Sequence, residues 1–165
     1  MTRTAAEAAA ADGSLQYVTL GVDSEIFAVD VEDVREILDM RAITRIPNAP
    51  SFLLGMIDVR GRAVPVIDLR AKLGLPPIAA NDQTRIVVLE TVVGEAQLVL
   101  GLLADRVFEV TPLDSHSVEP PPDIGVRWQS DYIRGIARRG ADFVIILKLG
   151  RLFSSEEAAL IGGGR

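Results

Sequence analysis

The chain has no cysteine, one histidine and two lysines in its 165 residues. Without cysteine it forms neither a disulfide nor a thiolate metal site, and it has no cysteine nucleophile. The single histidine, His116, argues against a histidine-rich zinc site and against a Ser-His-Asp triad. Because His116 stands between two serines beside a proline-rich segment, we interpret it as an exposed loop residue. Side chains suited to catalysis are therefore scarce.

Basic and aromatic residues are also in short supply. The 17 lysines and arginines are outnumbered by 23 acidic residues, giving a net charge of −6, and aromatic residues make up 5% of the chain. A nucleic-acid-binding protein needs a basic face that displaces counterions from phosphates, and a single-strand binder adds exposed aromatic rings. An oligonucleotide-binding barrel is therefore a weak alternative, and we expect no nucleic-acid partner.

The usual catalytic and membrane signals are missing as well. The chain has no G-x-x-x-x-G-K-[ST] loop, no dinucleotide fingerprint, no H-E-x-x-H and no G-x-S-x-G. The adjacent carboxylates Glu32-Asp33 and Glu156-Glu157 fit helix ends and faces better than an acid–base pair. No apolar run approaches the ~18–20 residues that span a bilayer, and acidic residues interrupt the alanine-rich start. We expect a cytoplasmic protein without enzymatic activity, cofactor or metal.

The apolar residues come in short segments separated by turn residues, which is typical of an all-β domain. Segments that flank a tight turn predict four hairpins: Tyr17–Val22 with Ile26–Val31, Gly55–Arg60 with Ala63–Leu69, Arg85–Val93 with Ala96–Leu103, and Ile133–Arg138 with Asp142–Leu149. Single strands are predicted at Val34–Met40 and Arg106–Val110, and short helices at Leu69–Leu73 and Leu149–Leu160. Residues 111–123 hold four prolines and predict a loop, while Pro65 predicts an edge position or a bulge.

The two halves of the chain resemble each other. Asp33–Ile37 is similar to Arg106–Val110, and the glycine-containing segment that starts at Phe52 is similar to the one that starts at Tyr132. We interpret this as an internal duplication, with pseudo-repeats at about 15–75 and 84–152 inside one domain of residues 14–160. It predicts two small, five-stranded β-barrels of the SH3/OB-like kind that pack on each other. Residues 1–13 are predicted to be a disordered tail, and residues 161–165 a flexible one.

Charged residues stand on predicted strand faces among apolar neighbours. A period of two places Glu36 on one face with Val34 and Leu38, and it places Asp58 and Arg60 on another face. Such charges either pair with each other at the surface, where a pair is worth ~0–1 kcal/mol, or mark a binding face. The pattern by itself leaves both interpretations open.

Several segments, in order along the chain, resemble the CheW family of bacterial chemotaxis coupling proteins. They are Val34–Ile37, Ile46-Pro47 with Pro50, Gly55–Gly61, Pro65–Arg70, Thr84–Val88, Gly101–Val107, Ser130–Gly135 and Ile145–Leu147. Each segment is a weak motif, but the ordered set is specific and covers about residues 14–160.

The resemblance implies two interlocked five-stranded barrels and a non-enzymatic scaffold. Such scaffolds couple chemoreceptors (methyl-accepting chemotaxis proteins) to the regulatory domain of a CheA-type histidine kinase. The helical hairpin tip of the receptor lies in an apolar groove between the barrels, a helix-in-groove mode of recognition. By the same resemblance, Val34 and Val110 match apolar positions of the receptor-binding region, and Glu36 and Arg60 match positions that pair and contribute to receptor coupling. The expected kinase contacts are not assigned to residues.

Asp58 and Gly61, which flank Val59 and Arg60, complete the expected receptor-binding set. Two positions depart from the family pattern: Asp58 replaces a common asparagine and could compete with Glu36 for Arg60, and Arg85 replaces a frequent apolar residue. Either change could alter which partner is preferred. The alternatives that stay open are a regulatory module of a pathway other than motility, such as pilus control, and an enzyme on a small-barrel fold.

Overall fold

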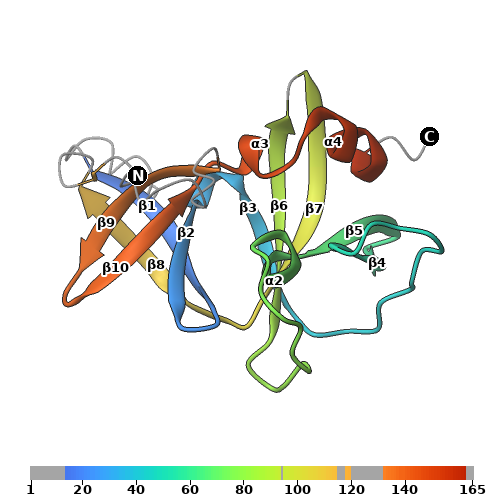
Figure 1. Ribbon diagram of the computed structural model, residues 1–165, viewed down its shortest axis with the longest axis horizontal. Coiled ribbons are helices and arrows are strands. Elements are labelled where there is room, and N and C mark those ends of the chain that lie inside the picture. Colours follow the sequence, from blue (N-terminus) through green and yellow to red (C-terminus); the bar gives the residue numbers. More distant parts are fainter. Residues whose placement is uncertain (1–13, 94, 115–117, 120–131, 163–165) are drawn as a thin grey trace, which may run out of the picture.

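The computed structural model describes residues 14–93, 95–114, 118–119 and 132–162. The elements, in order, are β1 (Ser14–Val22), β2 (Glu25–Asp30), the 3-10 turn η1 (Val31–Asp33), β3 (Val34–Asp39), β4 (Leu53–Val59), β5 (Arg62–Asp68), α2 (Leu69–Lys72), β6 (Arg85–Val93), β7 (Ala96–Ala104), β8 (Arg106–Asp114), β9 (Ile133–Arg139), β10 (Asp142–Leu147), α3 (Leu149–Leu152) and α4 (Ser155–Gly162) (Figure 1). The predicted tail 1–13, His116 and most of the predicted proline-rich loop lie outside the described residues.

The strands form two curled five-stranded sheets, which confirms the predicted all-β class. One sheet has the order β8-β1-β2-β10-β9 and is called barrel 1 below; the other has the order β3-β6-β7-β5-β4 and is called barrel 2. The two lie side by side in Figure 1, with barrel 1 on the left and barrel 2 on the right.

Both barrels follow one plan. An antiparallel hairpin, β1–β2 or β6–β7, carries an antiparallel strand on one side and a parallel strand on the other. The parallel strand, β10 or β5, belongs to a second hairpin with β9 or β4. Single bridges, Thr44–Met56 and Glu119–Ile136, bring the chain beyond β3 and β8 to the far edge of the sheet and close each barrel. Each barrel thus combines strands from both halves of the chain.

Three apolar clusters hold the barrels together. One, around Tyr17 and Val144, fills barrel 1, and another, around Ile57 and Ile86, fills barrel 2. The largest lies between the barrels and is called the central core; its members include alternate residues of the inner strands, such as Val18, Leu20 and Val22 of β1, Val87 and Leu89 of β6, and Leu98, Leu100 and Leu102 of β7. Each fully buried leucine stabilises the fold by roughly 1.5–3 kcal/mol. The barrels therefore depend on each other for much of their stability.

Two prolines sit inside strands for different reasons. Pro112 lies in β8, which extends to Asp114 rather than ending at Val110 as predicted. This strand is at the sheet edge, where a missing N–H is tolerated. Pro65 lies in β5, which is an inner strand and not the predicted edge. It is accommodated because pairing with β7 begins only at Val66, and because Met56 opposite exchanges its hydrogen bonds with Thr44.

The predicted C-terminal helix is two helices. Helix α3 ends at Leu152, and Phe153 and Ser154 separate it from α4. Helix α4 starts with a capping box, in which the Ser154 Oγ accepts the Glu157 N–H and Glu157 Oε1 accepts the Ser154 N–H. Phe153 is buried in the central core, so the break lets both helices cover barrel 2. Helix α4 packs across β7 there.

Candidate functional site

The face on which each β3 residue lies is set by a bulge. The pairing of β3 with β6 shifts by one residue between Val34 and Glu36. As a result Val34 and Ile37 lie on the face of the central core, whereas Glu36 and Leu38 lie on the face turned into barrel 2. The strict period-two prediction, which grouped Val34 with Glu36 and Leu38, was wrong at Val34.

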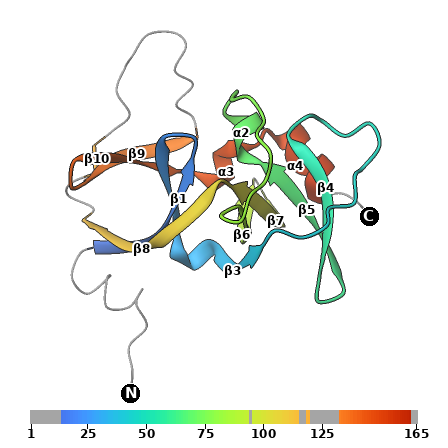
Figure 2. The same ribbon diagram turned by 90° about the horizontal axis from the view of Figure 1, so that it is seen from below.

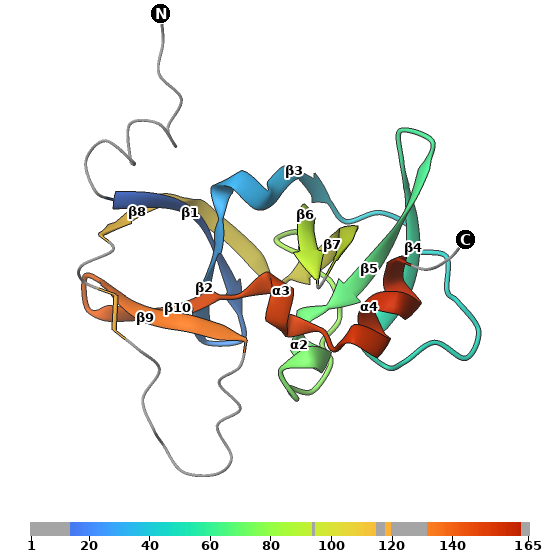
Figure 3. The ribbon, with the colours of Figure 1, turned by 90° about the horizontal axis from the view of Figure 1, so that it is seen from above.

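Strand β8 of barrel 1 has an equivalent irregularity in its pairing. A register shift in its pairing with β1 leaves Val107 opposite Leu20 and Val110 opposite Val18, both of which belong to the central core. Val107 is half-buried against that core, but Val110 is 49% exposed, as Ile37 is 43% exposed on β3. Strands β3 and β8 lie on the same side of the molecule, opposite α2 (Figures 2 and 3).

These four aliphatic residues, Val34, Ile37, Val107 and Val110, border the central core where it reaches the surface, and we call them the inter-barrel strip. The structure thus places the predicted residues Val34 and Val110 on the faces of β3 and β8 that turn toward the space between the barrels. Ile37 and Val107 were missed by sequence reasoning. The bulge that brings them onto this face left no signal in the sequence pattern, although the internal repeat pairs Val34 with Val107 and Ile37 with Val110.

Glu36 and Arg60 form a bidentate ion pair. The Arg60 Nη1 donates to Glu36 Oε2 at 2.6 Å, and Nη2 donates to Oε1 at 3.2 Å. The pair joins β3 to the β4–β5 turn, so it spans the two edge strands of the barrel 2 sheet. Arg60 is 79% exposed, and a pair this open to water contributes ~0–1 kcal/mol to stability. The Glu36–Arg60 pair lines a depression of about 390 Å³, which is also lined by a second ion pair, Arg35 with Glu90.

Asp58 and Gly61 shape the turn that presents Arg60. Arg60 and Gly61 both have positive φ, 53° and 83°, as in the type I′ turns that suit two-residue hairpins. The Asp58 Oδ1 accepts the Gly61 N–H at 2.7 Å, and the Asp58 carbonyl accepts a hydrogen bond from Arg41. Asp58 is therefore engaged with the turn backbone, and among the described residues Arg60 pairs with Glu36.

Barrel 1 carries a counterpart of this ion pair. Arg139, at the end of β9, donates to Glu109 of β8, and these are again the two edge strands of one sheet. The internal repeat aligns Glu36 with Glu109. The other departure noted in the sequence, Arg85, donates to the carbonyls of Asp82 and Thr84, and so holds the start of β6.

A buried polar cluster, not anticipated from the sequence, ties the barrels together. Arg70 of α2 is 5% exposed, and we call it and its two carboxylate partners the Arg70 cluster. Its Nη1 donates to Asp105 Oδ2 at 2.7 Å, its Nη2 to Asp23 Oδ1 at 3.3 Å, and its Nε to the Pro76 carbonyl at 2.8 Å. Asp23 is in the β1–β2 turn and Asp105 lies between β7 and β8. Helix α2 of barrel 2 is thereby fastened to barrel 1.

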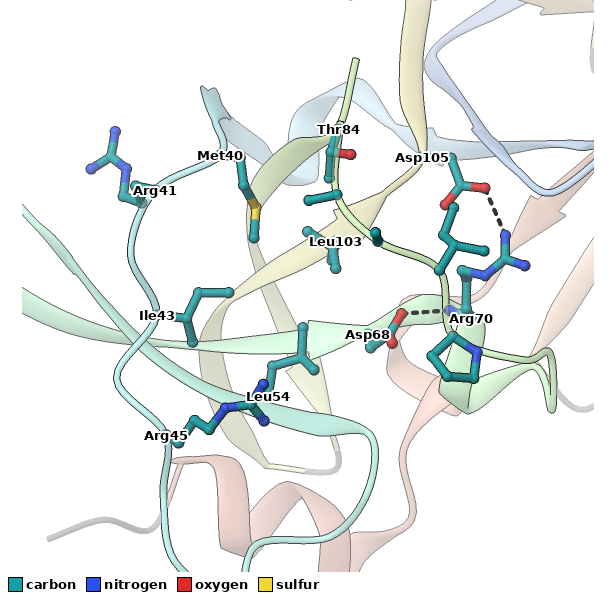
Figure 4. Close-up of a pocket in the computed structure, with 14 residues that line it drawn as sticks. Met40, Arg41, Ile43, Arg45, Leu54, Asp68, Arg70, Thr84, Leu103 and Asp105 are labelled. Atoms are coloured by element: carbon teal, nitrogen blue, oxygen red, sulfur yellow. Dashed lines mark hydrogen bonds and ion pairs between the residues drawn. The ribbon is translucent and has the colours of Figure 1, made fainter. Parts of the chain in front are cut away.

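A cavity of about 410 Å³ opens beside this cluster (Figure 4). Its wall combines aliphatic side chains with charged ones, of which Arg70 is engaged with Asp105, and Asp68 with the Arg70 N–H. Burial raises the pKa of Asp68 despite that hydrogen bond. Among the described residues no cluster of three histidine, aspartate or glutamate side chains could hold a metal ion. In the same part of the chain, no helix is long and apolar enough to cross a membrane.

Comparison with known proteins gives consistent matches. The model of the CheW-like domain family matches residues 16–157. Chemotaxis protein CheW of Klebsiella aerogenes is 31% identical over 146 residues, which are 88% of this chain and 86% of that protein. The crystal structure of scaffolding protein TtCheW from Thermoanaerobacter tengcongensis has a TM-score of 0.76 at 33% identity, covering 87% of this chain and 95% of that one. A shorter match, 31% identical over 58% of this chain and 53% of the other, is to Protein PilI of Pseudomonas aeruginosa.

Proposed function

The chain belongs to the CheW-like domain family of scaffold proteins, and from that premise we propose that it couples the cytoplasmic tips of chemoreceptors to a CheA-type histidine kinase. It acts in the cytoplasm, as a non-enzymatic adaptor. The kinase is bound through its regulatory domain. No nucleotide is needed for this role, and we expect none to bind, because no phosphate-binding loop was found in the sequence.

The inter-barrel strip is the observation that carries the proposal. Two of its aliphatic side chains are nearly half exposed, and they lie at equivalent places on the two barrels. Apolar residues arranged beside a core in this way are suited to the apolar face of a helix, which lays residues at i, i+3, i+4 and i+7 against them. Glu36 lies on β3 between Val34 and Ile37 but on the opposite face of the strand, and together with Arg60 it can give the contact specificity.

The experiment compares aspartate substitutions inside and outside the strip. Val110→Asp and Ile37→Asp should weaken binding of a receptor tip fragment by about 5- to 150-fold, since each puts an unpaired charge into an apolar contact worth roughly 1–3 kcal/mol. Ile78→Asp is the matched control, because Ile78 is also aliphatic and 52% exposed but lies at the cavity of barrel 2. Val34 is less suitable, because it packs on the central core and its substitution would also lower stability.

Titration by calorimetry with circular dichroism as the folding check separates the outcomes. Equal affinity of the wild-type protein and both strip variants, with the fold intact, would place the receptor elsewhere. The second candidate is a CheW-like module of a pathway other than motility, such as pilus control, and the observation that favours it is the partial match to Protein PilI. Capture of partners from the native cytosol distinguishes the two pathways, since each has its own receptor and kinase.

A further inference from the structure

The two repeats end in equivalent helices that differ in one decisive position. The Asp68 N–H donates to the Phe52 carbonyl at 2.8 Å just before α2, and the Lys148 N–H donates to the Tyr132 carbonyl at 2.7 Å just before α3. Both helices have four residues and begin with a buried leucine. This alignment places Gly150 where α2 has Arg70.

Barrel 1 has no guanidinium at the position equivalent to Arg70. In barrel 2 the Arg70 guanidinium donates to Asp105, as Figure 4 shows, and to Asp23. At Gly150 a Cβ atom would come within 2.9 Å of the Val92 carbonyl oxygen, so this position accepts no side chain without a backbone shift. Gly150 also lines a cavity of about 650 Å³, which we call the basic notch. It lies between η1, the end of β6, β9 and the α3 segment.

The charged side chains that line the basic notch are mainly basic, although the chain as a whole carries −6 and the carboxylates of Asp30 and Glu32 lie near Asp33. Arg134, Lys148 and Arg151 line it, against one carboxylate, Asp33. Arg134 is held by Asp30 at 2.9 Å. Lys148 occupies the N-cap position of α3 without making a capping hydrogen bond, whereas Asp68 caps α2. Acidic and small polar residues are preferred at N-caps, so the local backbone gives no reason for a lysine there.

The basic notch lies at one end of the inter-barrel strip. Asp33, which lines the notch, is followed directly by Val34 of the strip. On the barrel 1 side of the strip, only Arg106 separates Val107 from Asp105 of the Arg70 cluster. One end of the strip therefore lies beside the Arg70 guanidinium, which is already paired, and the other end lies beside the open basic notch.

We propose that the basic notch receives an acidic side chain of the helical segment that lies along the inter-barrel strip, and that this contact fixes the direction of that segment. The proposal rests on the proposed function, because the receptor tip is the helical partner. An acidic group is the fitting occupant since Lys148 and Arg151 supply charge-assisted donors at the mouth of an open, polar cavity. Opposite charges at one end alone penalise the reversed orientation, in which the acidic group would meet the Arg70 cluster and its carboxylates.

The test uses the full chain and a purified helical-hairpin tip fragment of a chemoreceptor from the same genome. Arg151→Glu and Lys148→Glu should each weaken binding at low salt by about five- to fiftyfold. Arg45→Glu is the matched control: Arg45 is exposed, its charge change is the same, and it lies at the cavity of barrel 2. The control should stay within twofold of the wild-type affinity, and thermal unfolding should show all variants folded.

A charge-reversal scan identifies the occupant. Acidic residues of the fragment are changed to lysine one at a time, and one of these changes should restore most of the affinity lost in Arg151→Glu. If Arg151→Glu and Lys148→Glu bind as Arg45→Glu does while Val110→Asp still weakens binding, the notch proposal is overturned and the proposed function stands. If no lysine variant restores affinity, an acidic side chain is not the occupant and the proposal is again overturned. If the wild-type protein does not bind the fragment, both fall.

Discussion

Barrel 1 and barrel 2 share a strand order, a bulge on the equivalent edge strand and an ion pair across equivalent edges, yet they differ where their hairpins end. After β5 the chain buries Arg70 between two carboxylates, and after β10 it has Gly150 and an open cavity. The hydrogen-bonded framework is common because it satisfies backbone groups that any sequence carries. The side chains at the two ends of the strip are free of that requirement, so they can diverge.

The two edge ion pairs illustrate the same contrast on a smaller scale. Both join the outer strands of one sheet, but Arg60 projects from a turn and is 79% exposed, whereas Arg139 lies on a strand and is 32% exposed. A side chain on a turn reaches further from the barrel wall. Arg60 is therefore better placed than Arg139 to meet a partner while it remains paired with Glu36.

The largest change in stability is expected on removal of Arg70, the residue that barrel 2 has and barrel 1 lacks at this position. Arg70→Ala leaves the largely buried Asp105 without its partner, and loss of one partner of a buried ion pair costs roughly 3–5 kcal/mol; Asp23 adds less, because its side chain is 52% exposed. Arg151→Ala, one position beyond the equivalent residue in the other repeat, should cost about 0.5 kcal/mol or less because Arg151 is exposed. Urea unfolding followed by circular dichroism measures both.

A cost below about 1 kcal/mol for Arg70→Ala would show that the Arg70 cluster does not fasten the barrels. The double variant Arg70→Ala with Asp105→Ala gives an independent check. Its free energy of unfolding should fall by less than the sum of the two single changes, since the two residues share one interaction.

The second test concerns the pair of Glu36 and Arg60. Arg60→Glu should change stability by less than about 1 kcal/mol, because the pair is exposed, but should impair receptor-dependent activation of the kinase. Exchanging the charges with Glu36→Arg and Arg60→Glu should recover binding, with a coupling energy of roughly 0.5–3 kcal/mol in a double-mutant cycle on the receptor fragment. Additive single effects would mean that the two residues act separately.

Barrel 1 supplies the control for this cycle. Arg139→Glu breaks the equivalent pair with Glu109, and we expect the receptor affinity to stay within about twofold of wild type. Asp58→Asn is a further control: an amide oxygen can accept the Gly61 N–H as the carboxylate does, so the cycle should give the same coupling in that background. A changed coupling would mean that Asp58 influences Arg60 after all.

The smallest effect is expected at α4, which covers barrel 2. Partial burial opposes ionisation of Glu157, but hydrogen bonds from the Ser154 N–H and from Lys72 outweigh it and lower the pKa of this carboxyl. A lowered folded-state pKa gives stability that is present above the unfolded value of about 4.3 and lost as the pH falls through the folded value. The stability advantage of the wild-type protein over Glu157→Gln should therefore shrink between pH 5 and pH 3, as measured by urea unfolding.

A constant difference across that pH range would exclude ionised Glu157 as the source of the advantage. The remaining contacts of Lys72, 4.7 Å above the Phe52 ring and 5.3 Å from the Phe153 ring, do not depend on the charge of Glu157. They should keep α4 in place when the carboxyl is neutral.

Most strands could be predicted from the sequence because local patterns specify them. The hairpins around Asp23 and Gly61 follow from apolar segments that flank turn residues, and the described strands agree with them within a few residues. The break between α3 and α4 was also available in the sequence, since Ser154 and Glu157 form a capping box. We predicted a single helix instead, because the segment after Ser154 is rich in residues of high helix propensity.

The pairing between distant segments could not be predicted in the same way. The bulge at Val34 depends on β6, and the burial of Arg70 depends on carboxylates from two turns far away in the chain. Period-two alternation is a property of one strand, and it gives no information about an extra residue that only the partner strand reveals. The residues of the strip on β3 and β8 therefore needed the structure, while Glu36 and Arg60 stood out by their charge.

The pairing of β10 with β2 bears on how the chain folds as it is made. Among the described strands, β1 and β2 are synthesised first, but the parallel neighbour of β2, strand β10, is synthesised last. Barrel 2 uses the consecutive strands β3 to β7, so all of its ladder partners exist while barrel 1 still lacks β8, β9 and β10. The β1–β2 hairpin therefore has both edges unpaired until β8 is made and one edge unpaired until β10 is made, which leaves it exposed to wrong pairing during synthesis.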